Sequence, residues 1–429
     1  MDIIQKYGDL IKSVSDTHPG LARKMIAFGL DEEIARMSIL PQKRLPKGMQ
    51  KLNRFSVNKV RKALKDPERS CWTNIFAPVE IMQCFDLNCL SMECLASFMS
   101  GFRTEDYLIN EAEASGIAPT MCSYHKSFIG GVDSGVLPKA KMAVTTSMVC
   151  DGNVMTFRHV EKKHGVPCFV LDIPYVYTKE NEAYLAEQLR ELISFLQEQT
   201  GRTFDMDRLR QVLERENLTR KYYRQFLSEL KHRYYPKTLT LDMYFLFPTH
   251  LDIGTQETLD LFRYLRKDIR SYPERHGKSI FWVHLLPYYQ ETLKSYFNYR
   301  EDYFIQAMDF NLDYMKELDT SHPLEALARK MIGNIYNGPY ERKVKAIARM
   351  VREFEPDGVI HFCHWGCKQS SGGVMLLREE IRKLGVPVLI LDGDALDRRN
   401  SHDGQIRTRL EAFLEMLDQQ EGQEQKNED

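Results

Sequence analysis

Apolar residues recur along this chain in two alternating patterns. Short apolar runs such as residues 140–149 are typical of buried strands, and the segments between them carry apolar residues at helical spacing. The order strand, helix, strand occurs twice, at residues 140–149, 154–164 and 166–174, and again at residues 356–362, 372–384 and 386–392. Because this order builds parallel sheets, we predict an α/β fold with two Rossmann-like lobes.

The same patterns divide the chain into five predicted parts. These are a helical N-terminal segment (1–70), a first α/β lobe (71–178), a helical connector (179–238), a second α/β lobe (239–417) and a disordered tail (418–429). The connector is charged and has leucines along one helical stripe. In the second lobe, the first predicted strands are residues 245–247 and 279–285.

Composition narrows the class of protein. The chain has 429 residues, of which 43% are hydrophobic and 28% charged, and its formal net charge is -1. This balance gives no electrostatic reason to expect nucleic acid as a partner. The start of the chain lacks the pattern of a secretory signal, and no apolar stretch is long enough to span a bilayer. We therefore expect a cytoplasmic protein whose nine cysteines are reduced thiols or metal ligands.

Three cysteines lie at predicted starts of helices. Cys150 and Cys367 follow predicted strands, and Cys122 precedes a short predicted helix. In an open α/β sheet such turns lie at the carboxyl edge, where ligands bind and a helix N-terminus stabilises a thiolate. The other cysteines of the first lobe lack this context, and we interpret them as packing residues: Cys71, Cys84, Cys89, Cys94 and Cys168.

Cys122 and Cys150 belong to one lobe and Cys367 to the other, so the three sulfurs are expected to meet between the lobes. Three thiolates without an obvious fourth ligand suit an iron–sulfur cluster or a metal with one open position. A local zinc site of Cys363, His364 and Cys367 remains an alternative. No phosphate-binding loop is present, because residues 277–279 (GKS) lack the required glycine and precede a strand.

Five segments, taken in order, resemble the 2-hydroxyacyl-CoA dehydratase family, which also contains benzoyl-CoA reductase subunits. The segments are residues 121–124 (MCSY), 149–151 (VCD), 171–174 (LDIP), 364–369 (HWGCKQ) and 405–415 (QIRTRLEAFLE). The resemblance implies that Cys122, Cys150 and Cys367 hold a [4Fe-4S] cluster. It also implies an acyl-CoA substrate, a second dehydratase subunit as a homo- or heterodimer partner, and a separate ATP-dependent iron–sulfur activator.

The implied reaction removes water from a 2-hydroxyacyl-CoA. One electron added to the thioester carbonyl gives a ketyl radical, which expels the 2-hydroxyl and makes the 3-hydrogen acidic. His364 and Gln369 flank Cys367, and Ser123 and His125 flank Cys122, so these four are candidates for catalysis or for fixing the ligands.

Arg409 is a candidate for binding a phosphate or carboxylate of the substrate. Three alternatives to the dehydratase remain open. These are a benzoyl-CoA reductase-type enzyme, a reductase with a double-cubane cluster, and a partner subunit that binds a cluster without catalysing the reaction.

Overall fold

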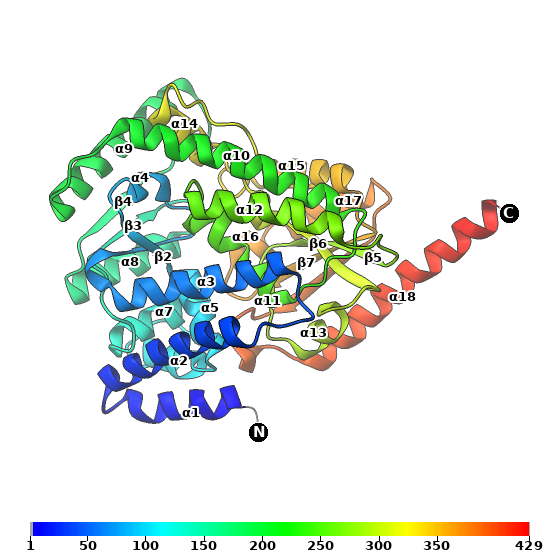
Figure 1. The fold of residues 1–429 in the computed structure, drawn as a ribbon, viewed down its shortest axis with the longest axis horizontal. Coiled ribbons are helices and arrows are strands. Elements are labelled where there is room, and N and C mark those ends of the chain that lie inside the picture. The colour runs from blue at the N-terminus through cyan, green and yellow to red at the C-terminus, as the bar shows by residue number, and fades with distance from the viewer. Residues whose placement is uncertain (1–2, 429) are drawn as a thin grey trace.

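The computed structural model describes residues 3–428 of the chain (Figure 1). The N-terminal segment forms three helices and a single 3₁₀ turn: α1 (Ile3–Ser15), α2 (Pro19–Ile39), α3 (Lys47–Lys65) and η1 (Pro67–Arg69). The connector is two long helices, α9 (Lys179–Thr200) and α10 (Met206–Leu230). Thr178 and Asp205 cap their N-termini through side-chain oxygens, and Gly201 ends α9 in the left-handed conformation.

The first lobe is built on a parallel sheet whose strand order is β2-β1-β3-β4. Its elements are β1 (Ser70–Thr73), α4 (Val79–Gln83), β2 (Asn88–Ser91), α5 (Met92–Gly101), α6 (Glu105–Ala114), α7 (Ser123–Asp133), β3 (Met142–Thr146), α8 (Asp151–His164) and β4 (Cys168–Leu171). Every residue of β1 and β3 is buried, as expected where helices cover both faces of a parallel sheet.

The second lobe repeats this topology, with the order β6-β5-β7-β8. Its strands are β5 (Lys278–Val283), β6 (Tyr303–Met308), β7 (Gly358–His364) and β8 (Val388–Gly393). Its helices are α11 (Leu239–Tyr244), α12 (Gln256–Asp268), α13 (Glu291–Phe297), α14 (Pro323–Ile332), α15 (Tyr340–Phe354), α16 (Lys368–Ser371), α17 (Val374–Arg382) and α18 (Asp403–Glu428), with short turns at η2 (Phe247–Leu251), η3 (Ile269–Ser271), η4 (Asp309–Leu312) and η5 (Arg398–Asn400).

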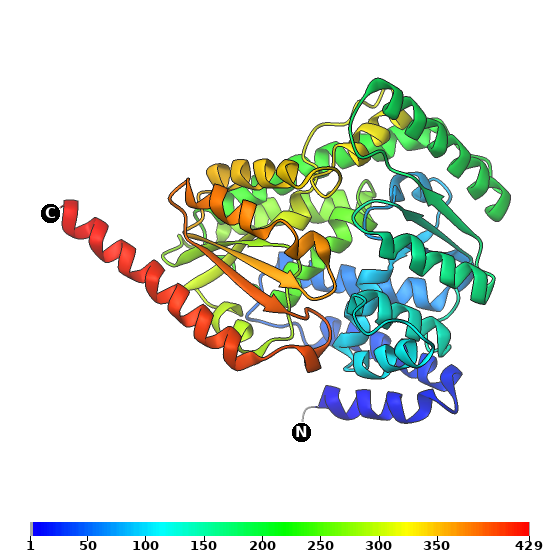
Figure 2. The same ribbon diagram turned by 180° about the vertical axis from the view of Figure 1, so that it is seen from behind.

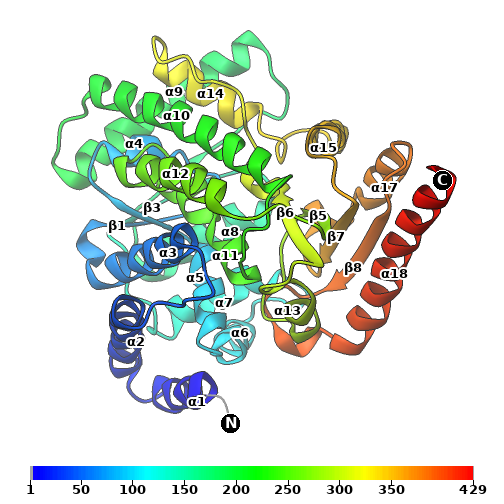
Figure 3. The same ribbon diagram turned by 45° about the vertical axis from the view of Figure 1, so that its right-hand side comes forward.

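The two sheets occupy separate halves of the molecule, as Figure 2 shows. Figure 3 shows α17 and α18 beside β8, against which both helices pack. One continuous hydrophobic core joins the two lobes and the connector. The predicted α/β fold with two Rossmann-like lobes is therefore confirmed. No helix within the described part of the chain is both long and apolar enough to cross a membrane.

Two local predictions differ from the structure. Residues 245–247, expected to be a strand, belong to the helical stretch of α11 and η2, because a short apolar run fits a buried helix as well as a strand. Of residues 418–429, expected to be a disordered tail, residues 418–428 continue α18, and Asp429 lies outside the described residues. That segment is rich in Glu, Gln and Lys, which are good helix formers. The Tyr303 hydroxyl donates a hydrogen bond to Asp418 at 2.7 Å.

Candidate functional site

Two of the three predicted cysteines lie at equivalent points of the two sheets. In each sheet the chain leaves the first strand toward one side and later returns to the other, which creates a switch point between β1 and β3 and between β5 and β7. Cys150 follows β3 and Cys367 follows β7, and each is the residue before a helix. Ligands of open α/β sheets bind at the carboxyl ends of strands at such points.

Cys122 joins them from the residue before α7. A methyl group added to Gly366 would lie 2.8 Å from the Cα and N atoms of Cys122, so the backbones of the two lobes touch here. None of the three cysteine side chains is used to cap its helix. All three cysteines line one cavity of about 800 Å³. The lobes thus bring the predicted residues together.

The backbone before each strand-to-helix cysteine is left-handed. Val149 has a φ of 80° and Gly366 a φ of 79°. His284, which follows β5, has a φ of 75°. Glycine adopts this conformation freely, but for the β-branched Val149 it is strained, and such strain concentrates at functional sites.

Each cysteine sulfur has the Nε2 atom of one histidine beside it. The distances are 3.2 Å between Cys122 and His364, 3.6 Å between Cys150 and His125, and 3.7 Å between Cys367 and His284. The Cys122–His364 contact joins the two lobes. Three thiols therefore share the cavity with three imidazoles.

The three imidazoles are neutral. Burial lowers the pKa of His125 to about 4 and lowers the pKa of both His364 and His284. The backbone N–H of Ala395 donates to Nδ1 of His364 at 3.0 Å, so the hydrogen of this ring is assigned to Nε2, facing the Cys122 sulfur. The hydrogen of the His125 ring also lies on Nε2 if the Thr156 hydroxyl, 2.8 Å from Nδ1, donates to that atom. Hydrogen bonds of this kind stabilise negative charge on sulfur.

The expectation that helix N-termini would stabilise thiolates is wrong for two of the cysteines. Burial raises the pKa of Cys122 and raises that of Cys150 to about 11, and the nearby Cys367 adds to both shifts. Desolvation therefore outweighs the helix dipole. A bound cation would reverse this balance, because metal binding deprotonates its thiol ligands.

The spacing of the sulfurs suits a group larger than one ion. Among the described side chains, only Asp133, His159 and His164 bring three ligand atoms within 4.8 Å of one another. The Asp133 carboxylate already has the Lys163 ammonium at 2.7 Å. The three cysteine sulfurs are therefore not all within 4.8 Å of one another, and a cluster offers each thiolate a different iron. The residues fit a cluster in chemistry and placement.

The alternative zinc site of Cys363, His364 and Cys367 is not assembled, since its ligand atoms are not among those that converge within 4.8 Å. His364 instead faces Cys122, and the Cys363 sulfur faces the carbonyl oxygen of Ser370 at 3.8 Å. Cys71, Cys84, Cys89 and Cys94 are buried as predicted for packing residues, although Cys94 also lines the cavity.

The other predicted residues have different surroundings. The Ser123 hydroxyl donates to Asp394 at 2.7 Å and so joins the lobes. Gln369 lies on α16 and does not line the cavity. Arg409 does not line it either, because its guanidinium pairs with Asp392 at 2.8 Å on the exposed face of α18. A contact between Arg409 and the substrate stays a prediction.

Two residues of the cavity are absent from the predicted site. His284 lies within the predicted strand 279–285 but directly follows the observed strand β5, so a strand predicted to end at Val283 would have located it by the switch-point rule. Glu93 is the second residue of α5, with no motif around it. Burial raises the pKa of its carboxyl to about 7, and its Oε2 atom has no hydrogen-bond partner. A carboxyl of this kind in a cavity wall is a candidate for proton transfer.

The fold and the site define a class of α/β protein with two lobes and a cysteine-lined cavity between them. Residues 74–417 match the model of the family described as 2-hydroxyglutaryl-CoA dehydratase, D-component, and the chain belongs to this family. Dehydratases of this family are lyases that eliminate water, so the prediction of an enzyme is confirmed at the level of the family.

The chain is similar to three characterised relatives. It is 24% identical to a subunit of the benzoyl-CoA reductase of Thauera aromatica over 79% of this chain and 86% of the relative. It is 23% identical to the (R)-phenyllactyl-CoA dehydratase alpha subunit of Clostridium sporogenes over 82% and 90%. It is 22% identical to the (R)-2-hydroxyglutaryl-CoA dehydratase alpha subunit of Acidaminococcus fermentans over 66% and 61%.

Proposed function

We propose that this chain is the cluster-binding catalytic component of a 2-hydroxyacyl-CoA dehydratase, with a [4Fe-4S] cluster held by Cys122, Cys150 and Cys367. The observation that carries the proposal is the opening of these three cysteines, from both lobes, into one cavity. When bound, the cluster supplies a low-potential electron and an open iron position for the thioester carbonyl oxygen.

The residues of the chain supply the surroundings that this chemistry needs. His364, His125 and His284 place neutral imidazole rings beside the three sulfurs, and the assigned N–H of His364 offsets negative charge on the Cys122 sulfur. The walls between the lobes are mostly apolar and exclude water from a reactive radical.

Glu93 is the proposed proton acceptor. Glu93 lines the same cavity as the three cysteines. Its negative charge also contributes to the raised pKa of Cys150, so the two side chains are close enough to interact. With a pKa of about 7, Glu93 can as a neutral carboxyl give its proton to the departing 2-hydroxyl, and as the resulting carboxylate can then take the 3-hydrogen, which becomes acidic once the hydroxyl has left. The net change is the loss of one water, and the electron returns for the next turnover.

The proposal includes two protein partners. The sequence contains no phosphate-binding loop, so ATP hydrolysis that drives the electron to low potential is assigned to a separate iron–sulfur activator. The relatives named as alpha subunits support a second dehydratase subunit. We place the reaction in the cytoplasm, where free thiols stay reduced.

A single cluster is favoured over a double cubane. The remaining cysteines either lie in the core or begin a strand, as Cys168 does in β4. Cys94 also follows a junction of strand and helix, between β2 and α5, but it is the third residue of its helix, whereas Cys150 and Cys367 are the residues before theirs.

The experiment is an oxygen-free assay of the full chain with its co-encoded partner, the activator, ATP and a reductant. Offered 2-hydroxyacyl-CoA thioesters, the mixture should form the enoyl-CoA, and omission of the activator should abolish the product. Reduction of benzoyl-CoA in place of dehydration would assign the reductase function instead. If the partner subunit is fully active without this chain, then this chain is a non-catalytic subunit.

A further inference from the structure

The cavity that holds the three cysteines extends from an exposed rim to a buried interior. At the rim, Ile3 of α1 is 80% exposed and Phe28 of α2 is 57% exposed. In the interior, Phe98, Tyr124 and Phe247 are at most 7% exposed. A thioester that enters between the N-terminal helices therefore presents its acyl end to the buried part of the cavity that the three cysteines also line.

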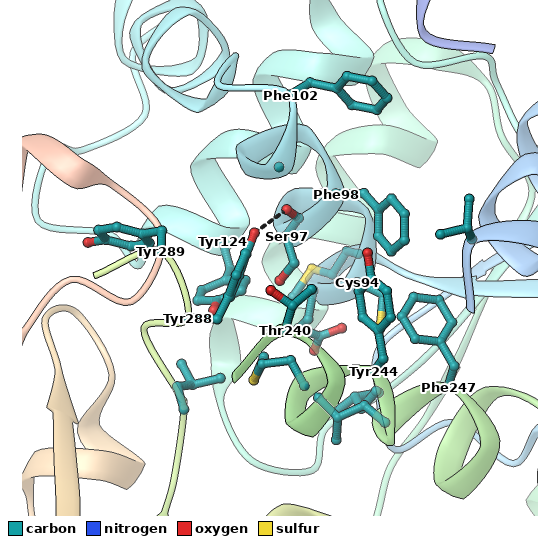
Figure 4. Close-up of a pocket in the computed structure, with 18 of the residues that line it drawn as sticks. Cys94, Ser97, Phe98, Phe102, Tyr124, Thr240, Tyr244, Phe247, Tyr288 and Tyr289 are labelled. Atoms are coloured by element: carbon teal, nitrogen blue, oxygen red, sulfur yellow. Dashed lines mark hydrogen bonds between the residues drawn. The ribbon is translucent and has the colours of Figure 1, made fainter. Parts of the chain in front are cut away.

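Aromatic rings dominate this buried part. Figure 4 shows Phe98, Tyr244 and Phe247 grouped on one side of the cavity, with Tyr288 and Tyr124 facing them. Phe98 stacks on Tyr244 with ring centroids 5.5 Å apart and planes 7° apart, and Phe247 meets both rings edge-on at 5.6 Å and 5.9 Å. Phe247 begins a π-helical turn, a rare conformation that is frequent at functional sites. These rings form a preorganised apolar wall.

The cationic side chains that line the cavity have partners already. Arg36 pairs with Glu33 at 2.6 Å, and Lys294 pairs with Glu291 at 2.9 Å. Arg398 pairs with Glu105 and lies over the Tyr289 ring. Arg103 donates to the amide oxygen of Gln5 at 3.0 Å.

The lining also includes the carboxyl groups of Glu32, Glu33 and Glu93. Glu32 lies at the exposed rim and Glu33 is paired with Arg36, but in the interior a carboxylate on the acyl group would lose its hydration and share the cavity with Glu93 without a dedicated cation. An apolar ring of matching size would gain contact with the three aromatic side chains. The lining therefore discriminates against acyl groups that end in a carboxylate.

We propose that the acyl group bound by this chain is apolar and aromatic-sized, of the aryl-propionyl kind, and that the wall formed by Phe98, Tyr244 and Phe247 selects it over dicarboxylic acyl groups such as glutaryl. This inference rests on the proposed function and deepens it, because it names the acyl class for the same cavity. The inferred acyl group therefore differs from 2-hydroxyglutaryl, the acyl group in the description of the matching family.

The test is binding of unreactive thioesters to the full chain, purified without oxygen, by isothermal titration calorimetry. The probes are 3-phenylpropionyl-CoA, glutaryl-CoA and coenzyme A. We expect 3-phenylpropionyl-CoA to bind at least about tenfold more tightly than glutaryl-CoA. A tenfold difference in affinity corresponds to about 1.4 kcal/mol, which one aromatic contact can supply. If glutaryl-CoA binds equally or more tightly, the inference is overturned. If neither thioester binds better than coenzyme A, the proposed function fails as well.

Three variants locate the selectivity. Tyr244→Ala should weaken 3-phenylpropionyl-CoA about tenfold and leave glutaryl-CoA nearly unchanged, whereas the matched Tyr244→Phe keeps the ring and the affinity. Thr240→Lys, also on the cavity wall, adds a cation and should improve glutaryl-CoA about tenfold without removing any ring. An unchanged ratio of the two affinities in both Tyr244→Ala and Thr240→Lys would place the acyl group elsewhere and overturn the inference.

Discussion

At the scale of single residues, burial decides the chemistry of the cavity. It raises the pKa of Glu93 to about 7, from an ordinary value of 4.5, while it keeps His125 and His364 neutral. A carboxyl whose pKa is raised by folding holds its proton more strongly in the folded state. Its contribution to stability is therefore most favourable below its unfolded pKa and is lost as the pH rises to about 7.

Glu93→Gln should remove this penalty. At pH 8 the variant should be more stable than the parent chain, by about 1.4 kcal/mol for each unit by which folding raises the pKa, and the difference should shrink toward pH 5. Urea unfolding at both pH values measures it. Dehydration should be lost while bound iron is retained, because the residue is proposed to move a proton and not to hold the cluster.

The matched control is Glu32→Gln at the exposed rim of the cavity. It should change stability by no more than about 0.5 kcal/mol at either pH. A stability gain for Glu93→Gln that is the same at pH 5 and pH 8 would contradict the role of burial.

At the scale of elements, the strand-to-helix turn is the unit that presents each sulfur. Gly366 serves the turn after β7 in two ways, through its left-handed φ and through its close approach to the backbone of Cys122. Gly366→Ala should destabilise the chain by roughly 1–3 kcal/mol and lower its iron content, because a methyl group there separates Cys122 from Cys367. Thermal unfolding and iron analysis measure the two effects.

Gly404→Ala is the matched control, since a methyl group at Gly404 meets no atom within 4 Å. It should stabilise α18 slightly, as alanine does in a helix. Equal iron contents for the Gly366→Ala and Gly404→Ala variants would show that the turn does not set the spacing of the sulfurs.

What can be predicted from the sequence also depends on whether the residues of the site belong to one local unit or to elements that are distant in the chain. The units around Cys150 and Cys367 are local patterns of strand, turn and helix, so sequence alone locates both residues. The strand predicted at residues 245–247 is wrong because three apolar residues are too few to distinguish the periodicity of a strand from that of a helix. Glu93 and Phe98 lie on α5, whereas Tyr244 and Phe247 lie on the consecutive elements α11 and η2, far from α5 in the chain, and no local pattern records that they meet.

At the scale of the whole molecule, buried charges tie the lobes to the connector. The Lys330 ammonium of α14 pairs with Glu216 of α10 at 2.8 Å and with Glu80 of α4. Burial raises the pKa of Glu80 to about 7, while Lys330 and Arg220 hold the pKa of Glu216 below its usual range. One cation thus serves three separate elements.

Lys330→Met should destabilise the chain by about 3–5 kcal/mol, because it leaves buried carboxylates without their counter-charge. Lys383→Met is the control, since Lys383 pairs with Glu380 on the surface, where such a pair contributes at most about 1 kcal/mol. Urea unfolding compares them. Similar losses in the two variants would rule out the buried network as the link between the lobes.

The central claim is that Cys122, Cys150 and Cys367 together hold one cluster between the lobes. The most direct test is the iron and acid-labile sulfide content of oxygen-free protein, for the parent chain and for Ser variants of single cysteines. We expect about four irons per chain in the parent and in Cys89→Ser, and a loss of iron in Cys122→Ser, Cys150→Ser and Cys367→Ser. Iron lost from Cys89→Ser but retained in Cys150→Ser would contradict the claim.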